Sequence, residues 1–113
     1  MKHAESNLQR QCVRWFRLQY PEPRYLIAAI PNGGHRNRIT AAIMKGEGVR
    51  AGVPDLIIIG QNKIMFVEMK SDKGRLSDSQ KEVAAIFMGN CIPVAVCNSF
   101  DLFQWTVNEW FKK

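Results

Sequence analysis

A chain of 113 residues with 46% hydrophobic content has room for one core, so we expect a single domain over residues 1–113. Its 16 Lys and Arg against 10 Asp and Glu give a formal net charge of +6, which suits a polyanionic partner but is also common among proteins that bind none. No stretch approaches the roughly 18 apolar residues of a membrane span, and no apolar run follows the N-terminus as in a secretory signal, so we expect an intracellular, cytoplasmic protein.

The cysteines and histidines argue against disulfides and structural zinc. Cys12, Cys91 and Cys97 form neither an even set nor a C-x-x-C pair, and His3 and His35 are the only histidines. We therefore expect three reduced and mostly buried thiols.

The first half of the chain contains patterns for two helices and one strand. Apolar residues at three- and four-residue steps predict an amphipathic helix from about Glu5 to Gln19, which two prolines end. The apolar run from Tyr25 to Ile30 predicts a buried strand that stops at Pro31-Asn32-Gly33-Gly34. A second helix is predicted over Ile39 to Lys45, and a glycine-rich loop follows it.

The middle of the chain predicts a hairpin. Two strands, Asp55 to Ile59 and Ile64 to Lys70, are separated by Gly60-Gln61-Asn62-Lys63, whose length and composition favour an antiparallel turn. Whether the loop contains two residues or four, the same pairing places Asp55 opposite Glu68.

The last third predicts a helix, a strand and a second helix. Ser77-x-x-Gln80 is typical of a capping box, and the helix it opens uses Val83, Ile86 and Phe87 as its apolar face and ends at Gly89-Asn90. Pro93 to Cys97 predicts a strand, and Ser99 can cap a last helix carrying Leu102, Phe103 and Trp110. Helices and strands then share one core, which predicts an α/β fold with a mixed β-sheet flanked by α-helices.

The hairpin carries the residues with chemical potential. Directly opposed side chains of an antiparallel pair have Cβ atoms about 5 Å apart, and two carboxylates so placed repel each other unless a cation lies between them. Lys70 follows Glu68 by two residues and shares its face, about 7 Å further along the strand. The alternative is that Glu68 and Lys70 are simply an exposed strand pair.

Oxygen ligands of this kind favour Mg²⁺ or Mn²⁺, which bind through one or two carboxylates and substrate phosphate. Such an ion polarises a phosphodiester and activates water. Lys70 could hold or deprotonate that water, or stabilise charge developing on the phosphate.

These residues resemble a known family. Gly52-Val53-Pro54-Asp55-Leu56 followed by Val67-Glu68-Met69-Lys70 is similar to the PD-(D/E)XK nuclease signature, and the wider pattern resembles its VRR-NUC branch, the virus-type replication and repair nucleases. Three further segments match in order: Glu5-x-x-Leu8-Gln9, Pro31-Asn32-Gly33-Gly34, and Gly74-Arg75-Leu76-Ser77-x-x-Gln80.

The resemblance implies a restriction-endonuclease-like core in which Asp55 and Glu68 bind metal, the backbone carbonyl of Met69 adds a ligand and Lys70 assists the water. Glu5 and Gln80 would complete the catalytic site, with Glu5 also a candidate metal ligand. Each has a simpler alternative, because Glu5 suits the positive end of its helix and capping explains Gln80.

Basic and polar residues around the predicted site are candidates for contacts with DNA phosphates. They are Asn32, His35, Arg36, Arg38, Lys45, Arg50, Lys73 and Arg75. Each of the basic residues could equally be a solvated surface charge. For Arg10, Arg14 and Arg17, on the polar face of the first helix, the solvated face is the favoured interpretation.

We therefore expect a structure-specific DNA endonuclease, such as a Holliday-junction resolvase acting on branched DNA. The alternatives are a less selective endonuclease or nickase and a DNA-binding module without catalysis. A symmetric cut needs two sites, and the apolar side chains of Phe87, Met88, Trp105, Trp110 and Phe111 exceed what a small core needs. Both points predict a homodimer.

Overall fold

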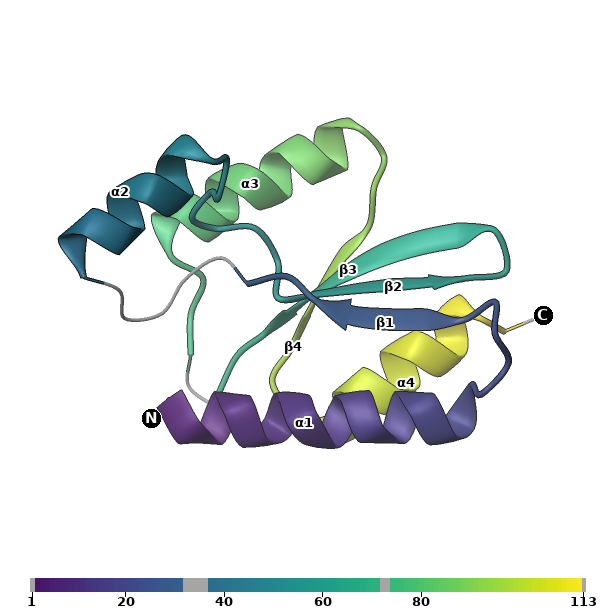
Figure 1. Ribbon diagram of the computed structural model, residues 1–113. Coiled ribbons are helices and arrows are strands. Elements are labelled where there is room, and N and C mark those ends of the chain that lie inside the picture. Colours follow the sequence, from purple (N-terminus) through teal and green to yellow (C-terminus); the bar gives the residue numbers. More distant parts are fainter. Residues whose placement is uncertain (1, 32–36, 72–73, 113) are drawn as a thin grey trace.

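The computed structural model describes residues 2–31, 37–71 and 74–112, and its elements follow the predicted order (Figure 1). A sheet of four strands is surrounded by four helices in this part of the chain. The elements are α1 (Lys2–Gln19), β1 (Leu26–Ala29), α2 (Arg38–Gly46), β2 (Leu56–Gly60), β3 (Lys63–Met69), α3 (Asp78–Gly89), β4 (Val94–Cys97) and α4 (Phe100–Trp110). No helix among these residues is long and apolar enough to cross a membrane.

The sheet is mixed, with strand order β1-β2-β3-β4. β1 and β2 pair antiparallel, as do β2 and β3, whereas β3 and β4 run parallel. Parallel neighbours need a crossover connection, and α3 supplies it between β3 and β4. The predicted α/β architecture is confirmed.

A two-residue turn joins β2 to β3. Gln61 and Asn62 both have positive φ, 52° and 62°, which is the backbone of a type I′ turn. Such a conformation is unfavourable for glutamine, but the Gln61 Nε2 donates to the Tyr25 hydroxyl at 2.9 Å and to the Phe111 carbonyl at 3.1 Å. These two bonds hold the turn against the C-terminal end of α4.

The core lies between the sheet and two helices, α1 and α4, which cover one face of the sheet (Figure 1). Cys12 and Phe16 of α1 and Phe103 of α4 are buried there, and Trp15 packs edge-on against Phe103 with ring centroids 6.0 Å apart. On the opposite face, Phe66 of β3 meets Phe87 of α3 edge-on at 4.7 Å. The helix α3 therefore covers the second face near β4.

Two predictions about burial need correction. The strand β1 is not buried throughout: Ile27 is, but Leu26 is 46% exposed, because β1 is an edge strand with only one covered face. Within the apolar face predicted for α3, Val83 is buried, whereas Ile86 is 45% exposed. Of the three thiols, Cys12 and Cys97 are buried and Cys91 is exposed, and all three are free.

The aromatic residues near the C-terminus divide between core and surface. Phe111 is 4% exposed and packs against Phe16, so its prediction as spare surface is wrong. Trp105 and Met88 are 63% and 71% exposed. The predicted surplus of apolar side chains is therefore smaller than expected.

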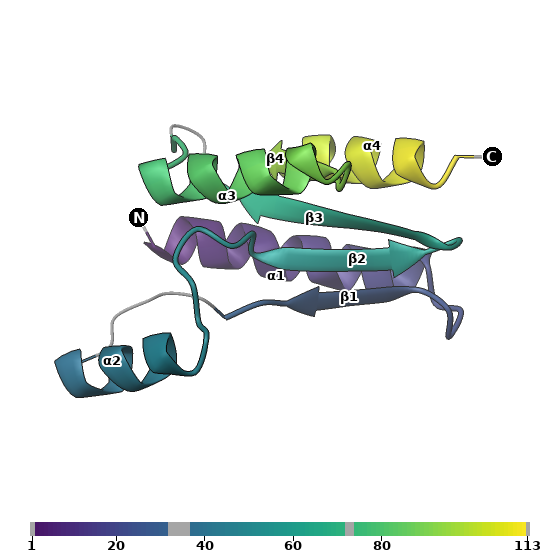
Figure 2. The same ribbon diagram turned by 90° about the horizontal axis from the view of Figure 1, so that it is seen from above.

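The helix α2 stands apart from the core. Asn37 caps it by accepting a hydrogen bond from the Thr40 N–H at 2.7 Å, and no residue of α2 is buried. Figure 2 shows α2 beyond the sheet at the end where α1 begins. Its Ile39 and Ile43, one turn apart, are both exposed.

Candidate active site

Asp55 and Glu68 meet at the end of the hairpin opposite its turn. Leu56 pairs with Val67, so the same register continued by one position places Asp55 opposite Glu68 as predicted. Glu68 is 3% exposed and is the buried charged residue of the described part of the chain. The Asp55 Oδ2 also accepts a hydrogen bond from the Met69 N–H at 2.7 Å. Glu68 therefore lies within β3, and Asp55, directly before β2, is held against β3 by this bond.

The environment of Glu68 favours its neutral form. Burial, followed by the hydrogen bond to Asp55 and the charge of Asp55, raises the pKa of Glu68 to about 9, although the charge of Lys70 acts to lower it. Two carboxylates close enough to share a hydrogen bond cannot both stay ionised without a compensating positive charge. In the metal-free protein a proton on Glu68 removes one of the two negative charges. A bound cation could balance both charges instead.

Lys70 lies directly beyond β3 with its backbone anchored and its side chain restricted. Its N–H donates to the Cys97 carbonyl at 3.0 Å, which continues the pairing with β4. A Cβ added to Gly74 would come within 3.3 Å of the Lys70 Cδ, so the returning loop packs against the lysine stem. The ammonium lies near enough to Glu68 to affect its pKa.

Gly52 fixes the approach of the chain to Asp55. Its φ is +93°, and a Cβ at this position would collide with the backbone carbonyl of Ser79 in the first turn of α3. An ion pair of 3.0 Å between Arg50 and Glu82 adds a second link between this loop and α3. The contact between Gly52 and Ser79 was not predicted, because the residues around a single glycine do not indicate which distant segment approaches it.

Gln80 acts as the predicted helix cap. Its Oε1 accepts from the Ser77 N–H at 2.8 Å, and its own N–H donates to the Ser77 Oγ at 3.2 Å. The capping box is confirmed. Because the cap uses Oε1, a role for Gln80 in the site would fall to its Nε2 amide group.

Glu5 lies in the first turn of α1, half-buried, and its charge contributes to raising the pKa of Glu68. Among residues 2–31, 37–71 and 74–112, no three His, Cys, Asp or Glu side chains gather as a metal cluster. The hairpin brings together two carboxyl groups, those of Asp55 and Glu68.

The backbone beside this pair offers a third oxygen. With the register continued once more, Met69 faces Pro54, which has no N–H to donate. The Met69 N–H points to the β2 side, where Asp55 accepts it, and the carbonyl of the same residue points to that side too. Pro54 therefore cannot donate the backbone hydrogen bond that the Met69 carbonyl would otherwise accept from the opposite strand.

The predicted DNA-contacting residues are only partly described. Arg38, Lys45 and Arg75 are exposed, whereas Arg50 is engaged with Glu82. The predictions for Asn32, His35, Arg36 and Lys73 concern residues outside the described ranges.

Comparisons with known proteins agree with this geometry. The family model of the VRR-NUC domain matches residues 1–101. A solved structure described as a VRR_NUC domain superposes with a TM-score of 0.70 at 20% identity, covering 96% of this chain and 98% of that one. A second, described as a VRR_NUC domain protein, gives a TM-score of 0.75 at 21% identity over 96% and 88%. No curated protein matches the sequence.

We predict that Glu68→Gln stabilises the metal-free protein at neutral and mildly alkaline pH. Between pH 4.5 and about 9 the folded protein keeps a proton on Glu68 that the unfolded chain releases, so the free energy of unfolding falls as pH rises. Glutamine removes this loss, and we expect a gain of at least about 1 kcal/mol near neutral pH. Thermal unfolding in EDTA across this range measures it.

The matched control is Glu22→Gln, at an exposed position after α1, which should leave the pH dependence unchanged. If Glu68→Gln unfolds at the same or a lower temperature throughout the alkaline half of the window, Glu68 is ionised in the metal-free protein.

Proposed function

We propose, because the chain belongs to the VRR-NUC family of nucleases, that it is a metal-dependent, structure-specific DNA endonuclease. The observation that supports this most directly is the buried Glu68 facing Asp55 with Lys70 on the same side. A buried carboxyl group that faces a second, partly exposed one is costly for a purely structural strand end. It suits a site that exchanges a proton for a cation.

The donor atoms fit Mg²⁺ or Mn²⁺. Asp55, Glu68 and the Met69 carbonyl are hard oxygen donors, and two carboxylates with open positions are the usual protein contribution to a magnesium site. With only two carboxylates in the described cluster, substrate phosphate and water would complete the coordination. Glu5 would act at longer range, by holding water beside the pair.

The bound ion would polarise the scissile phosphodiester and neutralise charge that develops on it. The protein's own part follows from the geometry. Asp55 is oriented by the Met69 N–H and cannot rotate freely. The ammonium of Lys70 can hold the attacking water and stabilise negative charge on the phosphate. Gln80 could orient a water through its Nε2.

Recognition is proposed to rest on DNA shape. Arg38, Lys45 and Arg75 are exposed basic side chains that suit phosphate contacts, and phosphates carry no sequence information directly. A branched substrate such as a four-way junction presents phosphates in a distinctive arrangement. Cleavage of plain duplex at the same rate would instead indicate the less selective endonuclease.

We predict that cleavage requires a divalent ion and that Asp55→Asn and Glu68→Gln each abolish it while DNA binding survives. Removing one carboxylate removes the charge that holds the cation. The measurement is a gel assay on duplex, flap and four-way junction DNA with Mg²⁺, Mn²⁺ or EDTA. Asp101→Asn, exposed in the first turn of α4, is the control and should cleave normally. Full activity in EDTA would exclude the metal mechanism.

We predict that Lys70→Ala slows cleavage by about 10²-fold or more, because the lost ammonium acts on water or on developing charge. Metal affinity should change little, and Lys70→Arg should not restore the rate, since a planar guanidinium cannot occupy the same position. Single-turnover rates at saturating metal measure this, with the exposed Lys112→Ala as control. A normal rate for Lys70→Ala would make Lys70 a surface charge.

We also propose a homodimer as the active unit. One chain contributes one Asp55 and Glu68 pair, whereas a symmetric double cut needs two sites related by a two-fold axis. Exposed apolar side chains that could form an interface are Ile39, Ile43, Met88 and Trp105.

Sedimentation at micromolar protein should then give twice the 12.9 kDa mass of the chain. Charged replacements at the interface, tested separately as Trp105→Glu and Ile43→Glu, should identify the helix involved by producing a monomer that nicks only one strand. A wild-type monomer that makes paired, symmetric cuts would contradict the dimer.

A further inference from the structure

The helix α1 presents three arginines on its solvent side. Arg10, Arg14 and Arg17 are all exposed, and at about 100° per residue they fall within an arc of roughly 60°. The buried Cys12 and Phe16 lie on the opposite side of the helix. We call these three residues the arginine face.

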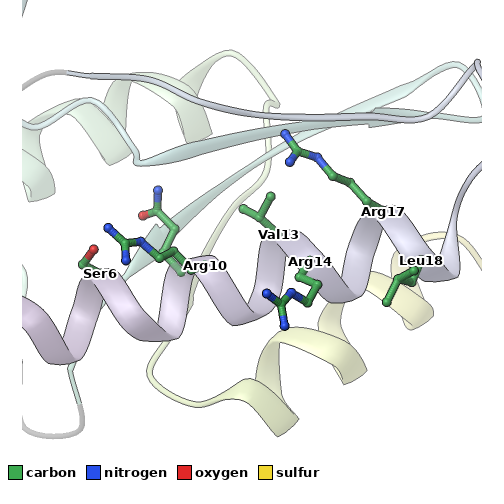
Figure 3. Close-up of a pocket in the computed structure, with 7 residues that line it drawn as sticks. Ser6, Arg10, Val13, Arg14, Arg17 and Leu18 are labelled. Atoms are coloured by element: carbon green, nitrogen blue, oxygen red, sulfur yellow. The ribbon is translucent and has the colours of Figure 1, made fainter.

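The surface around the arginine face is mixed in chemistry. It borders an open groove of about 640 Å³ along α1 (Figure 3). Ser6 and Gln9 add hydrogen-bonding groups to this groove, and Val13 and Leu18 add apolar surface. In Figure 3, Arg10 and Arg17 extend from α1 on the side of β1, away from α4.

The positive charge of this face is not compensated within the described residues. The ion pairs found there join Arg50 to Glu82 and Lys112 to Glu109, and neither involves the arginine face. The sequence of α1 contains one acidic residue, Glu5, which lies about 140° around the helix from Arg10. Three like charges this close repel one another, so a polyanion bound across them relieves that repulsion.

We propose that the arginine face is a second DNA-binding surface, separate from the catalytic residues, that holds the phosphates of a DNA arm. The proposal rests on the proposed function, because that function makes DNA the ligand. Arg10 and Arg17 are about 10.5 Å apart along the helix axis, which spans about three base-pair steps of one strand. One guanidinium group can donate two parallel hydrogen bonds to the oxygens of a phosphate, and the side chains of Ser6 and Gln9 can donate to neighbouring phosphate oxygens.

The position of this face predicts a separation of binding from chemistry. Arg10 follows Glu5 by about 7.5 Å along the axis, so the groove starts beside the end of α1 that approaches the candidate site. Arg10 and Arg17 extend on the side of β1, the edge strand, whereas Asp55 and Glu68 belong to the β2–β3 hairpin. Loss of the arginines should therefore weaken DNA binding and leave the rate of the bound complex unchanged.

The test is a salt titration of DNA binding by Arg10→Gln/Arg17→Gln, measured with Ca²⁺ in place of the catalytic ion. Glutamine has nearly the helix propensity of arginine, so α1 should persist. The control, Arg24→Gln/Lys112→Gln, removes the same two charges from exposed positions outside the groove. Fluorescence anisotropy on a short duplex and on a four-way junction, between about 50 and 200 mM salt, gives the slope of log affinity against log salt.

We expect the arginine-face variant to lose about 1.8 from this slope, roughly 0.9 for each phosphate contact, while the control loses much less. Arg10→Lys/Arg17→Lys should recover the slope, and Arg14→Gln alone should lose about 0.9. If Arg10→Gln/Arg17→Gln unfolds, the salt slope of Arg14→Gln alone tests the proposal. At saturating protein the single-turnover cleavage rate of the arginine-face variants should equal that of the wild type.

Equal slopes for the arginine-face variant and the control would overturn the proposal, and so would a wild type that binds no DNA. If an acidic polypeptide binds the wild type but not the arginine-face variant, while both bind DNA with equal slopes, the face belongs to a protein partner. A wild type that binds DNA with the expected slopes but cleaves nothing in Mg²⁺ or Mn²⁺ would refute the proposed function and leave the arginine face standing.

Discussion

Asp55 and Glu68 are held opposite each other by the register of the β2–β3 hairpin, and two residues at the other end of that hairpin set the register. Gln61 and Asn62 adopt the left-handed backbone of a type I′ turn, which fixes a two-residue loop. A slip of one residue would move Glu68 to the face of the sheet that packs on α1 and α4. The bonds from Gln61 to Tyr25 and Phe111 therefore also support the site at a distance.

The segment before β2 gives the glycine, proline and aspartate of this motif distinct physical roles. Gly52 allows the backbone to touch Ser79, which brings α3 against the strand end. Pro54 lacks the N–H that would otherwise face the Met69 carbonyl, and Asp55 accepts the Met69 N–H. Gly52 and Pro54 shape the backbone and packing around the site, and Asp55 supplies the acidic group. The motif is therefore a packing and hydrogen-bonding unit as well as a set of candidate ligands.

Much of this arrangement follows from local pattern. The hairpin register, the Ser77 capping box and the Ser99 cap each depend on residues close in sequence, and the structure has all three. Long-range packing could not be predicted from local sequence in the same way. Alternation could not reveal that β1 is an edge strand, and composition could not reveal that Phe111 packs in the core against Phe16 and Tyr25. The contact between Gly52 and Ser79 joins segments 27 residues apart, and nothing local to either predicts it.

The chain is basic overall, but its candidate site is acidic, so attraction of DNA and binding of a cation would depend on different groups. In the proposed function, exposed cations spread over α1, α2 and the loops attract DNA, and this attraction is long-ranged and weakened by salt. The carboxyl pair would oppose that attraction if both groups were charged, but burial and the neighbouring Asp55 keep a proton on Glu68 when no cation is present. In the proposed function a bound cation would displace this proton, so the pair would contribute little repulsion either way. The same burial that makes Glu68 a poor acid in the metal-free protein would strengthen its attraction for a cation that replaced the proton, because water screens charges poorly at this buried strand end.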